Sequence, residues 1–307
     1  MFQKSTTVFF YSVSPVHMGA GSAVGVIDNP IQREKHSDHP MFAGSGLKGA
    51  LRHSFATLGG DTNLINRLFG PDTNASDHAG AFSFGDAQLV VFPVRSLRGG
   101  FVYVTCPYAL ARLHRMLMLT GKAPDWDVPA APKAGEGCTA INDELLADNA
   151  LHLEVFQFTQ NVSAKDALQK VADWLAASSL PSCASHDYFR EKLKHHLVLL
   201  SDEDFKYFVQ NATTVEPHVC IDPDTGTAKG AGLFYTENLP PESLLVAPLM
   251  TSAERTPEKK RNGDTALDAS AVLAKITSAL ANKGGLLQVG GDATTGRGLV
   301  VARVLEG

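Results

Sequence analysis

The residues best suited to act on a phosphate group lie near the N-terminus, in a segment with several basic side chains. Asp28 is a lone carboxylate in an irregular stretch, and His17 lies eleven residues before it. A carboxylate can bind a divalent cation or accept a proton, and a histidine can act as an acid or a base near neutral pH. The plainer alternative is that Asp28 caps a turn and that His17 has no special task. The residue types alone leave both interpretations open.

A second group of candidates follows, where a glycine-spaced turn leads into a predicted helix. Residues 44–52 read GSGLKGALR, and Ser45 is a plausible N-cap. Lys48 and Arg52 are four residues apart, so they are neighbours on one helix face. With Ser45 and Gly46 they could hold a phosphate at the helix start, where the first N–H groups have no internal partners. The spacing does not match the P-loop of nucleotide-binding proteins, and a capped turn is the simpler alternative.

Two further features near the C-terminus could contribute to a site. Residues 290–298 read GGDATTGRG and lie between two apolar runs. They could form a flexible turn, or a loop whose backbone amides approach a phosphate or another chain. Tyr235 and Glu237 lie on one face of a predicted strand, because side chains alternate along a strand. An ordinary solvated strand face would look the same.

The composition is that of a globular protein and narrows the function classes. The chain has 307 residues, 44% of them hydrophobic, and a formal net charge of −5. This charge argues against a protein that coats nucleic acid by bulk attraction, but it allows a local basic groove. No apolar run approaches the roughly 20 residues that span a bilayer, and no signal peptide is evident. The four cysteines include no C-x-x-C pair, which speaks against a structural zinc site and favours a cytoplasmic location.

The elements that must position these candidates are a mixture of strands and helices. A hairpin is predicted over residues 81–96, and the helix that follows the first glycine-spaced turn should end at Gly59 and Gly60. Helical periodicity predicts further helices at 107–119, 164–177, 187–199, 202–210 and 266–285. Apolar and β-branched runs predict strands at 6–13, 101–106, 151–158, 213–222, 230–240, 244–249, 286–291 and 299–305. Hairpins together with crossovers indicate an α+β fold, for which a ferredoxin-like core with long insertions fits the count.

Several of these stretches, taken in order, resemble one protein family. Residues 25–40 read GVIDNPIQREKHSDHP and are followed by GSGLKGALR; further matches are LVLLSDEDF at 197–205, DPDTGTAKGAGLFYTENLP at 222–240 and QVGGDATTGRGLV at 288–300. Together they resemble the RAMP superfamily of CRISPR-associated proteins. The DNPIQRE segment is most similar to the backbone subunit of type III-B effector complexes. The resemblance covers both ends and much of the centre, whereas residues 60–150 match only loosely.

The resemblance implies both an architecture and an activity. It implies a single domain over residues 1–307, with an RNA-recognition-motif-like palm, inserted fingers and a thumb-like β-hairpin. Copies of the chain would stack in a helical filament along a CRISPR RNA, together with other type III-B subunits, and would cleave complementary target RNA at regular intervals. The alternative is a non-catalytic RNA-binding scaffold like the type III-A backbone subunit. Ladder-like cleavage of a complementary RNA by the assembled complex would distinguish the two.

The resemblance also implies roles for individual residues. Asp28 matches the catalytic acid and would bind a loosely held Mg²⁺ or Mn²⁺ or act as a base, and His17 and Glu237 match positions near the same centre. The implied RNA-binding residues are Arg33, Ser45, Gly46, Lys48, Gly49, Arg52, Gly290, Gly291, Thr294, Thr295, Gly296 and Arg297. Because guide–target pairing supplies the sequence specificity, such a protein needs to read only backbone and shape.

Overall fold

The molecule is built around one large, mostly antiparallel sheet. The computed structural model describes residues 2–23, 25–57, 61–73, 76–228 and 232–305. The sheet has 12 strands, with β2 beside β4, β3 beside β12, and the others in the order β13-β14-β1-β12-β4-β5-β9-β6-β8-β7. In chain order the strands are β1 (Lys4–Ser12), β2 (Met41–Phe42), β3 (Phe82–Phe84), β4 (Ala87–Arg95), β5 (Phe101–Thr105), β6 (Gly137–Ala140), β7 (Ala150–Leu153), β8 (Phe156–Gln160), β9 (Leu197–Leu199), β12 (Leu244–Thr251), β13 (Leu286–Gln288) and β14 (Leu299–Val304).

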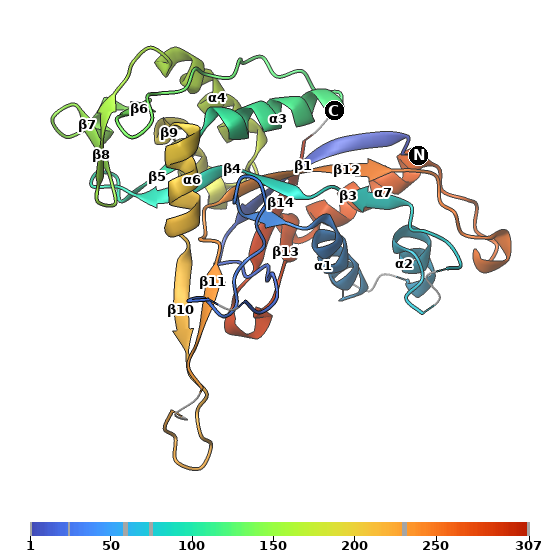
Figure 1. Cartoon of the computed structure of the whole chain (residues 1–307). Helices are drawn as coiled ribbons and strands as arrows, with labels where there is room; N and C mark the ends of the chain where they lie inside the picture. The colour runs from blue at the N-terminus through green and yellow to red at the C-terminus, as the bar shows by residue number, and fades with distance from the viewer. Residues whose placement is uncertain (1, 24, 58–60, 74–75, 229–231, 306–307) are drawn as a thin grey trace.

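Helices cover both faces of this sheet. They are α1 (Gly44–Thr57), α2 (Thr62–Phe69), α3 (Pro107–Leu119), α4 (Lys165–Ser178), α5 (Asp187–His195), α6 (Asp202–Asn211) and α7 (Ala269–Ala281). Successive side chains of a strand point to opposite faces. Accordingly, Phe10 packs into the core below the sheet with α1, α6 and α7, whereas Phe9 packs into the core above it with α3 and α4. Figure 1 shows these two layers.

A separate two-stranded hairpin leaves the sheet and projects away from it. It consists of β10 (Thr214–His218) and β11 (Phe234–Asn238), which pair antiparallel. Figure 1 shows it below α6, with its loop at the far end. Pro217 lies opposite Tyr235. Proline is tolerated there because the backbone of Tyr235 points away from β10, so the missing N–H removes no bond between the two strands.

The α+β class is confirmed, and three of the predicted elements need correction. Residues 81–96 do not form a hairpin, because β3 and β4 each pair with β12 instead of with each other. The predicted strand 151–158 is a hairpin of β7 and β8 that turns at Glu154, whose φ is +52°. The predicted helix 187–199 ends at His195, and Leu197–Leu199 form the buried strand β9 between β5 and β6. A short apolar run is compatible with either a helix or a strand, so periodicity alone could not separate them.

Two remaining expectations concern helix ends and membranes. The predicted end of α1 at Gly59 and Gly60 falls outside the described residues. None of the helices in the described ranges combines the length and the apolar character needed to cross a bilayer.

Candidate functional site

The free edge of β11, opposite β10, organises the site. Tyr235 accepts a hydrogen bond from the Asn29 N–H, and Glu237 donates one to the Asn29 carbonyl, each at 3.0 Å. Two residues further, Leu239 exchanges both of its backbone hydrogen bonds with Val16, each at 2.9 Å. Alternate residues of a strand turn their N–H and C=O groups to the same side. Two irregular segments that are distant in sequence are therefore held along one strand edge.

Asp28 is fixed to this edge through its side chain. Its Oδ2 accepts a hydrogen bond from the backbone N–H of Tyr235 at 2.7 Å, and its carbonyl accepts one from Ala23 at 2.9 Å. The residue is half-buried. Within the described part of the chain, Oδ1 has no hydrogen bond. Asp28 therefore combines the turn-capping contact that the plainer interpretation expects with one carboxylate oxygen that is available to a ligand.

His17 is held on the same edge with a defined tautomer. Its Nδ1 lies 2.8 Å from the carbonyl oxygen of Glu237. A carbonyl only accepts, so Nδ1 carries the proton and Nε2 of the neutral ring is an acceptor. Two glycines pack so closely against His17 that a side chain at either position would clash with it. A Cβ on Gly19 would lie 2.8 Å from His17 Nε2, and one on Gly290, whose φ is +80°, would lie 2.3 Å from the His17 carbonyl oxygen.

Glu237 has a different environment from the one expected of a catalytic group. It is 3% exposed. Its Oε1 accepts hydrogen bonds from Arg33 Nη2 at 2.5 Å and Thr213 Oγ1 at 2.7 Å, and its Oε2 accepts one from the Ile31 N–H at 3.1 Å. These contacts use both carboxylate oxygens inside the protein. Because both oxygens are bound inside the protein, we infer that Glu237 supports the site, and a role in the chemistry itself stays a prediction.

Arg33 is turned inward as well, which argues against its predicted contact with RNA. Besides Glu237, its guanidinium donates to the backbone carbonyls of Asp38 and Val209, both at 2.8 Å. Arg33 thereby ties the Asp28 segment to α6, which contains Val209. With Glu237 it forms a buried brace behind the strand edge that holds Asp28 and His17.

The start of α1 differs from the predicted phosphate site. The helix begins at Gly44, so Ser45 is an exposed residue of the first turn and not the N-cap. The Gly44 N–H donates to Asp86 Oδ1 at 2.8 Å, which places a carboxylate where a phosphate was expected. A Cβ on Gly46 would lie 3.2 Å from the Met18 side chain, whereas one on Gly49 would meet open space. The helix start therefore packs against the residue next to His17.

Lys48 and Arg52 extend from α1 toward α2 and β3. Lys48 Nζ donates to the Phe82 carbonyl at 3.1 Å and lies 5.0 Å from the centre of the Phe82 ring. Burial lowers the pKa of Lys48, and the charge of Arg52 lowers it further. Arg52 donates to the Gly70 carbonyl at 2.7 Å and lies 3.3 Å from Asp72. Both side chains are half-buried, so they are held in fixed directions.

The glycine-rich loop lies between the His17 segment and the hairpin. Gly291 donates to the His17 carbonyl at 2.8 Å, and Gly298 to the Pro15 carbonyl at 2.7 Å. Arg297 forms an ion pair with Glu216 of β10 at 2.5 Å. Thr294, Thr295 and Gly296 are exposed. The structure thus gathers Asp28, His17 and this loop around β11, and places Lys48 and Arg52 on a separate helix.

Sequence reasoning missed the groups that position the site. The Tyr235 N–H holds Asp28, and Thr213 supports Glu237. The first contact is made by a backbone N–H, and since every residue except proline has one, the sequence cannot indicate it. In the described ranges, no group of three or more His, Cys, Asp or Glu side chains could hold a metal ion.

Known proteins are similar to this chain in sequence and in fold. A profile of the RAMP superfamily matches residues 9–301. The CRISPR system Cmr endoribonuclease Cmr4 of Pyrococcus furiosus is 35% identical over 307 residues, which cover 99% of this chain and 96% of the relative. The crystal structure of oligomeric Cmr4 from the same organism matches with a TM-score of 0.72 and 27% identity over 99% of both chains. A chain of the type III-B Cmr-beta structure bound to cognate target RNA matches with a TM-score of 0.70 and 18% identity, over 99% of this chain and 98% of the other, and supports the fold.

The family match covers nearly the whole chain, from β1 to β14, and therefore includes all the segments that meet at β11. The identity to the curated relative extends over the same length. The chain therefore belongs to the RAMP superfamily and, within it, to the family that contains Cmr4.

Proposed function

We propose that the chain is the guide-binding backbone subunit of a type III-B CRISPR complex and that it cleaves the target RNA paired with the guide. The carrying observation is the edge of β11, which holds a carboxylate and an imidazole whose second polar atoms, Asp28 Oδ1 and His17 Nε2, make no hydrogen bond to any described residue. The similarity to an endoribonuclease and to an oligomeric relative supports this function and stacking of copies along the RNA. We expect the assembly, with its other type III-B subunits, to act in the cytoplasm.

The architecture suggests how the parts of one domain, residues 1–307, are used. We assign the palm to the strands around β1, β12 and β4, and the fingers to the segments around β6, β7 and β8. The hairpin of β10 and β11 is the thumb. It carries exposed apolar side chains, among them Val219, Ile221 and Phe234. Such side chains can wedge between bases, as other proteins do when they unstack a duplex.

The proposed reaction uses the 2′-hydroxyl of the RNA as its nucleophile. A regular duplex holds this hydroxyl, the phosphorus and the leaving oxygen out of line, and a thumb that displaces a base pair would release the strand into the in-line geometry. His17 Nε2 accepts the proton of the hydroxyl as the bond from O2′ to phosphorus forms. The bond from phosphorus to O5′ breaks, and O5′ takes up a proton from water. The products are a 2′,3′-cyclic phosphate and a 5′-hydroxyl.

Asp28 fits a metal ion only as a single ligand. It offers one free oxygen, and the described residues provide no cage around it. Mg²⁺ is commonly held by one or two carboxylates together with waters and substrate phosphates, so the RNA would complete the shell. When bound, a divalent ion would neutralise charge on the scissile phosphate.

Removing divalent ions is expected to stop cleavage without releasing the RNA. A singly anchored, oxygen-ligated ion exchanges readily, so EDTA should strip it, and Mg²⁺ or Mn²⁺ should restore the activity. Guide and target binding, measured by gel shift in the same samples, should be unchanged because the backbone contacts need no metal. Full cleavage after exhaustive chelation would leave Asp28 and His17 as a metal-free acid–base pair.

Guide binding is expected to depend on α1. Lys48→Ala together with Arg52→Ala should weaken binding of every guide sequence alike, because both cations would contact backbone phosphates. The slope of log K against log salt should fall by about 0.7 for each lost contact with a single strand. A matched control is Arg115→Ala with Lys170→Ala, which removes the same charge from exposed positions on α3 and α4. Equal slopes in the two double variants would argue against an RNA contact at α1.

A non-catalytic scaffold is the second candidate function. It is favoured by one observation, the bond between Asp28 Oδ2 and the Tyr235 N–H, because a purely structural acid would make the same contact. The two functions predict different behaviour of Asp28 variants.

A further inference from the structure

A third cation, Arg255, lies beside the pair on α1. Arg255 Nη1 donates to the Gly80 carbonyl at 3.1 Å. A Cβ on Gly80 would lie 2.7 Å from Lys48 Nζ, so Lys48 and Arg255 approach the same residue from two segments. Burial is the largest cause that lowers the pKa of Lys48, and the charges of Arg52 and Arg255 lower it further. Arg255 is exposed.

The hydrogen bonds that hold these three cations end mostly on uncharged oxygens. Lys48, Arg52 and Arg255 each donate to a backbone carbonyl, namely that of Phe82, Gly70 and Gly80 respectively. A carbonyl orients a cation without neutralising it. Among the described residues, the one ion pair with a carboxylate joins Arg52 to Asp72, whose side chain is 69% exposed. The cluster therefore keeps an excess of positive charge.

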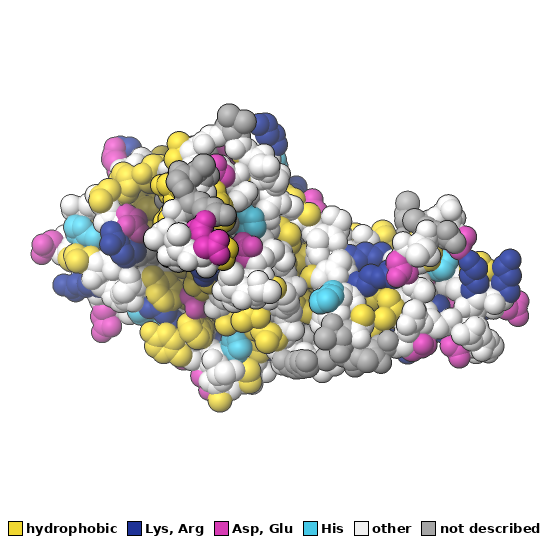
Figure 2. All heavy atoms as spheres, turned by 90° about the horizontal axis from the view of Figure 1, so that it is seen from below, with side chains coloured by type: hydrophobic (Ala, Val, Ile, Leu, Met, Phe, Trp, Pro, Cys, Tyr) yellow, Lys and Arg dark blue, Asp and Glu magenta, His cyan; other side chains and the backbone are white. Residues whose placement is uncertain are grey.

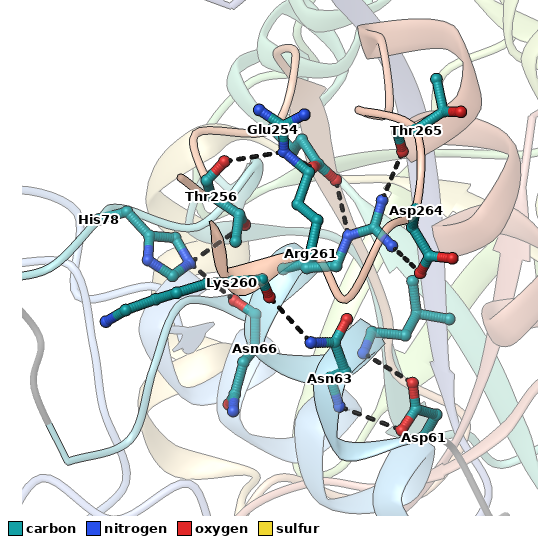
Figure 3. Close-up of polar contacts among 12 residues, drawn as sticks. Asp61, Asn63, Asn66, His78, Glu254, Thr256, Lys260, Arg261, Asp264 and Thr265 are labelled. Atoms are coloured by element: carbon teal, nitrogen blue, oxygen red, sulfur yellow. Dashed lines mark hydrogen bonds and ion pairs between the residues drawn. The ribbon is translucent and has the colours of Figure 1, made fainter. Parts of the chain in front are cut away.

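The carboxylates nearest to Arg255 in the chain and in the neighbouring loop are paired with other cations. Glu254 has a fully buried side chain that pairs with Arg67 at 3.0 Å and with Arg261 at 3.2 Å. Asp77 pairs with Lys260. Figure 3 shows the part of this network around Glu254, where Glu254, Asp264 and Thr265 surround the guanidinium of Arg67. Since Glu254 is anchored there, the backbone of the next residue is fixed as well.

We propose that Lys48, Arg52 and Arg255 form one phosphate-binding site for the RNA backbone, with Arg255 as its third cation. This site rests on the proposed function, because it requires RNA to run along α1. Among the described residues, the Arg255 guanidinium donates only to the Gly80 carbonyl, so its other N–H groups and its planar shape suit phosphate oxygens. On the face seen from below, Figure 2 shows Lys and Arg side chains gathered beside hydrophobic ones. Lys48 and Arg52 also lie over the Phe82 and Phe69 rings, at 5.0 and 5.8 Å.

The test compares full-length variants for binding of a fluorescently labelled single-stranded RNA over a series of salt concentrations. Arg255→Gln removes the charge and keeps a side-chain donor for the Gly80 carbonyl, so it should fold like the wild type in a thermal melt. We expect its Kd to rise about three- to tenfold and the salt slope to fall by about 0.7. Arg255→Lys should keep most of the slope. The charge-matched control Arg115→Ala should bind like the wild type.

The outcomes separate this proposal from the one on which it rests. A wild-type Kd and slope for Arg255→Gln, with weakened binding by the Lys48 and Arg52 variants, would remove Arg255 from the site and leave the function standing. A wild-type chain that binds no RNA even at low salt would overturn both. Inorganic phosphate at constant ionic strength tests the source of the phosphate. Release of RNA from the wild type at a lower phosphate concentration than from Arg255→Gln would support a site that RNA and phosphate share, whereas Arg255-dependent binding of phosphate that leaves the bound RNA in place would identify a site for free phosphate and overturn the RNA assignment.

Discussion

Asp28→Ala is expected to abolish target cleavage while guide binding and assembly stay intact. The backbone of Asn29 remains paired with Tyr235 and Glu237, so the segment should keep its place on β11. The variant loses the carboxylate that would bind the ion or accept a proton, and such a loss lowers rates by about 10²–10⁴-fold or more. The measurement is the ladder of products from a labelled complementary RNA in the assembled complex.

Asp28→Asn is the matched control for the structural role of the acid. The amide oxygen can still accept the hydrogen bond from the Tyr235 N–H, whereas the charge is gone. We expect this variant to be as stable as the wild type and as inactive as Asp28→Ala. Cleavage by Asp28→Asn at the wild-type rate would show that the side chain only caps its turn, and the scaffold function would then be preferred.

Glu237→Ala is expected to destabilise the protein by about 3 kcal/mol, because breaking a buried ion pair leaves its partner charge uncompensated. The partner is Arg33, and the Ile31 N–H loses its acceptor as well. We choose the lower end of the usual range since the Arg33 side chain is 19% exposed. Urea unfolding of the full-length chain measures the change in free energy.

Glu216→Ala provides the comparison for this variant. Glu216 of the hairpin also pairs with an arginine, Arg297 of the glycine-rich loop, but both side chains are about one quarter exposed, at 25% and 26%. Surface pairs contribute about 0–1 kcal/mol, so this change should be small. If Glu237→Ala kept wild-type stability and lost cleavage, a direct role in the chemistry would replace the supporting role proposed for Glu237.

The fold was predictable where the local pattern was strong. The helices at α3, α4, α6 and α7 have an apolar stripe of the right period, and the structure has them within a few residues of the predicted ranges. The errors arose where pairing is decided by distant partners. β3 and β4 read as a hairpin because they are adjacent, yet both prefer the long buried strand β12. Leu197–Leu199 form a strand because their backbone pairs with β5 on one side and with β6 on the other.

The sequence named candidate residues for the site but not the contacts that hold them. Asp28 and His17 were named because their surrounding motifs resemble those of a known family. Their fixation depends on backbone groups of β11, which every residue type carries equally. Glu237 and Arg33 were also named from the family motif, but only the structure shows that the two side chains form an ion pair with each other. Residue type and spacing cannot distinguish a buried brace from an exposed reactive group.

The pairing of two N-terminal segments with β11 also sets the time at which the site can form during synthesis. The bond from Tyr235 to Asp28 closes over 207 residues, and the bond from His17 to Glu237 over 220. Contacts so distant in sequence form late in folding, because the entropy of closing the loop must be overcome first. While β11 is still inside the ribosome, a nascent chain therefore cannot hold Asp28 in place. If the proposed site is the nuclease centre, an incomplete chain therefore lacks it until β11 has been made.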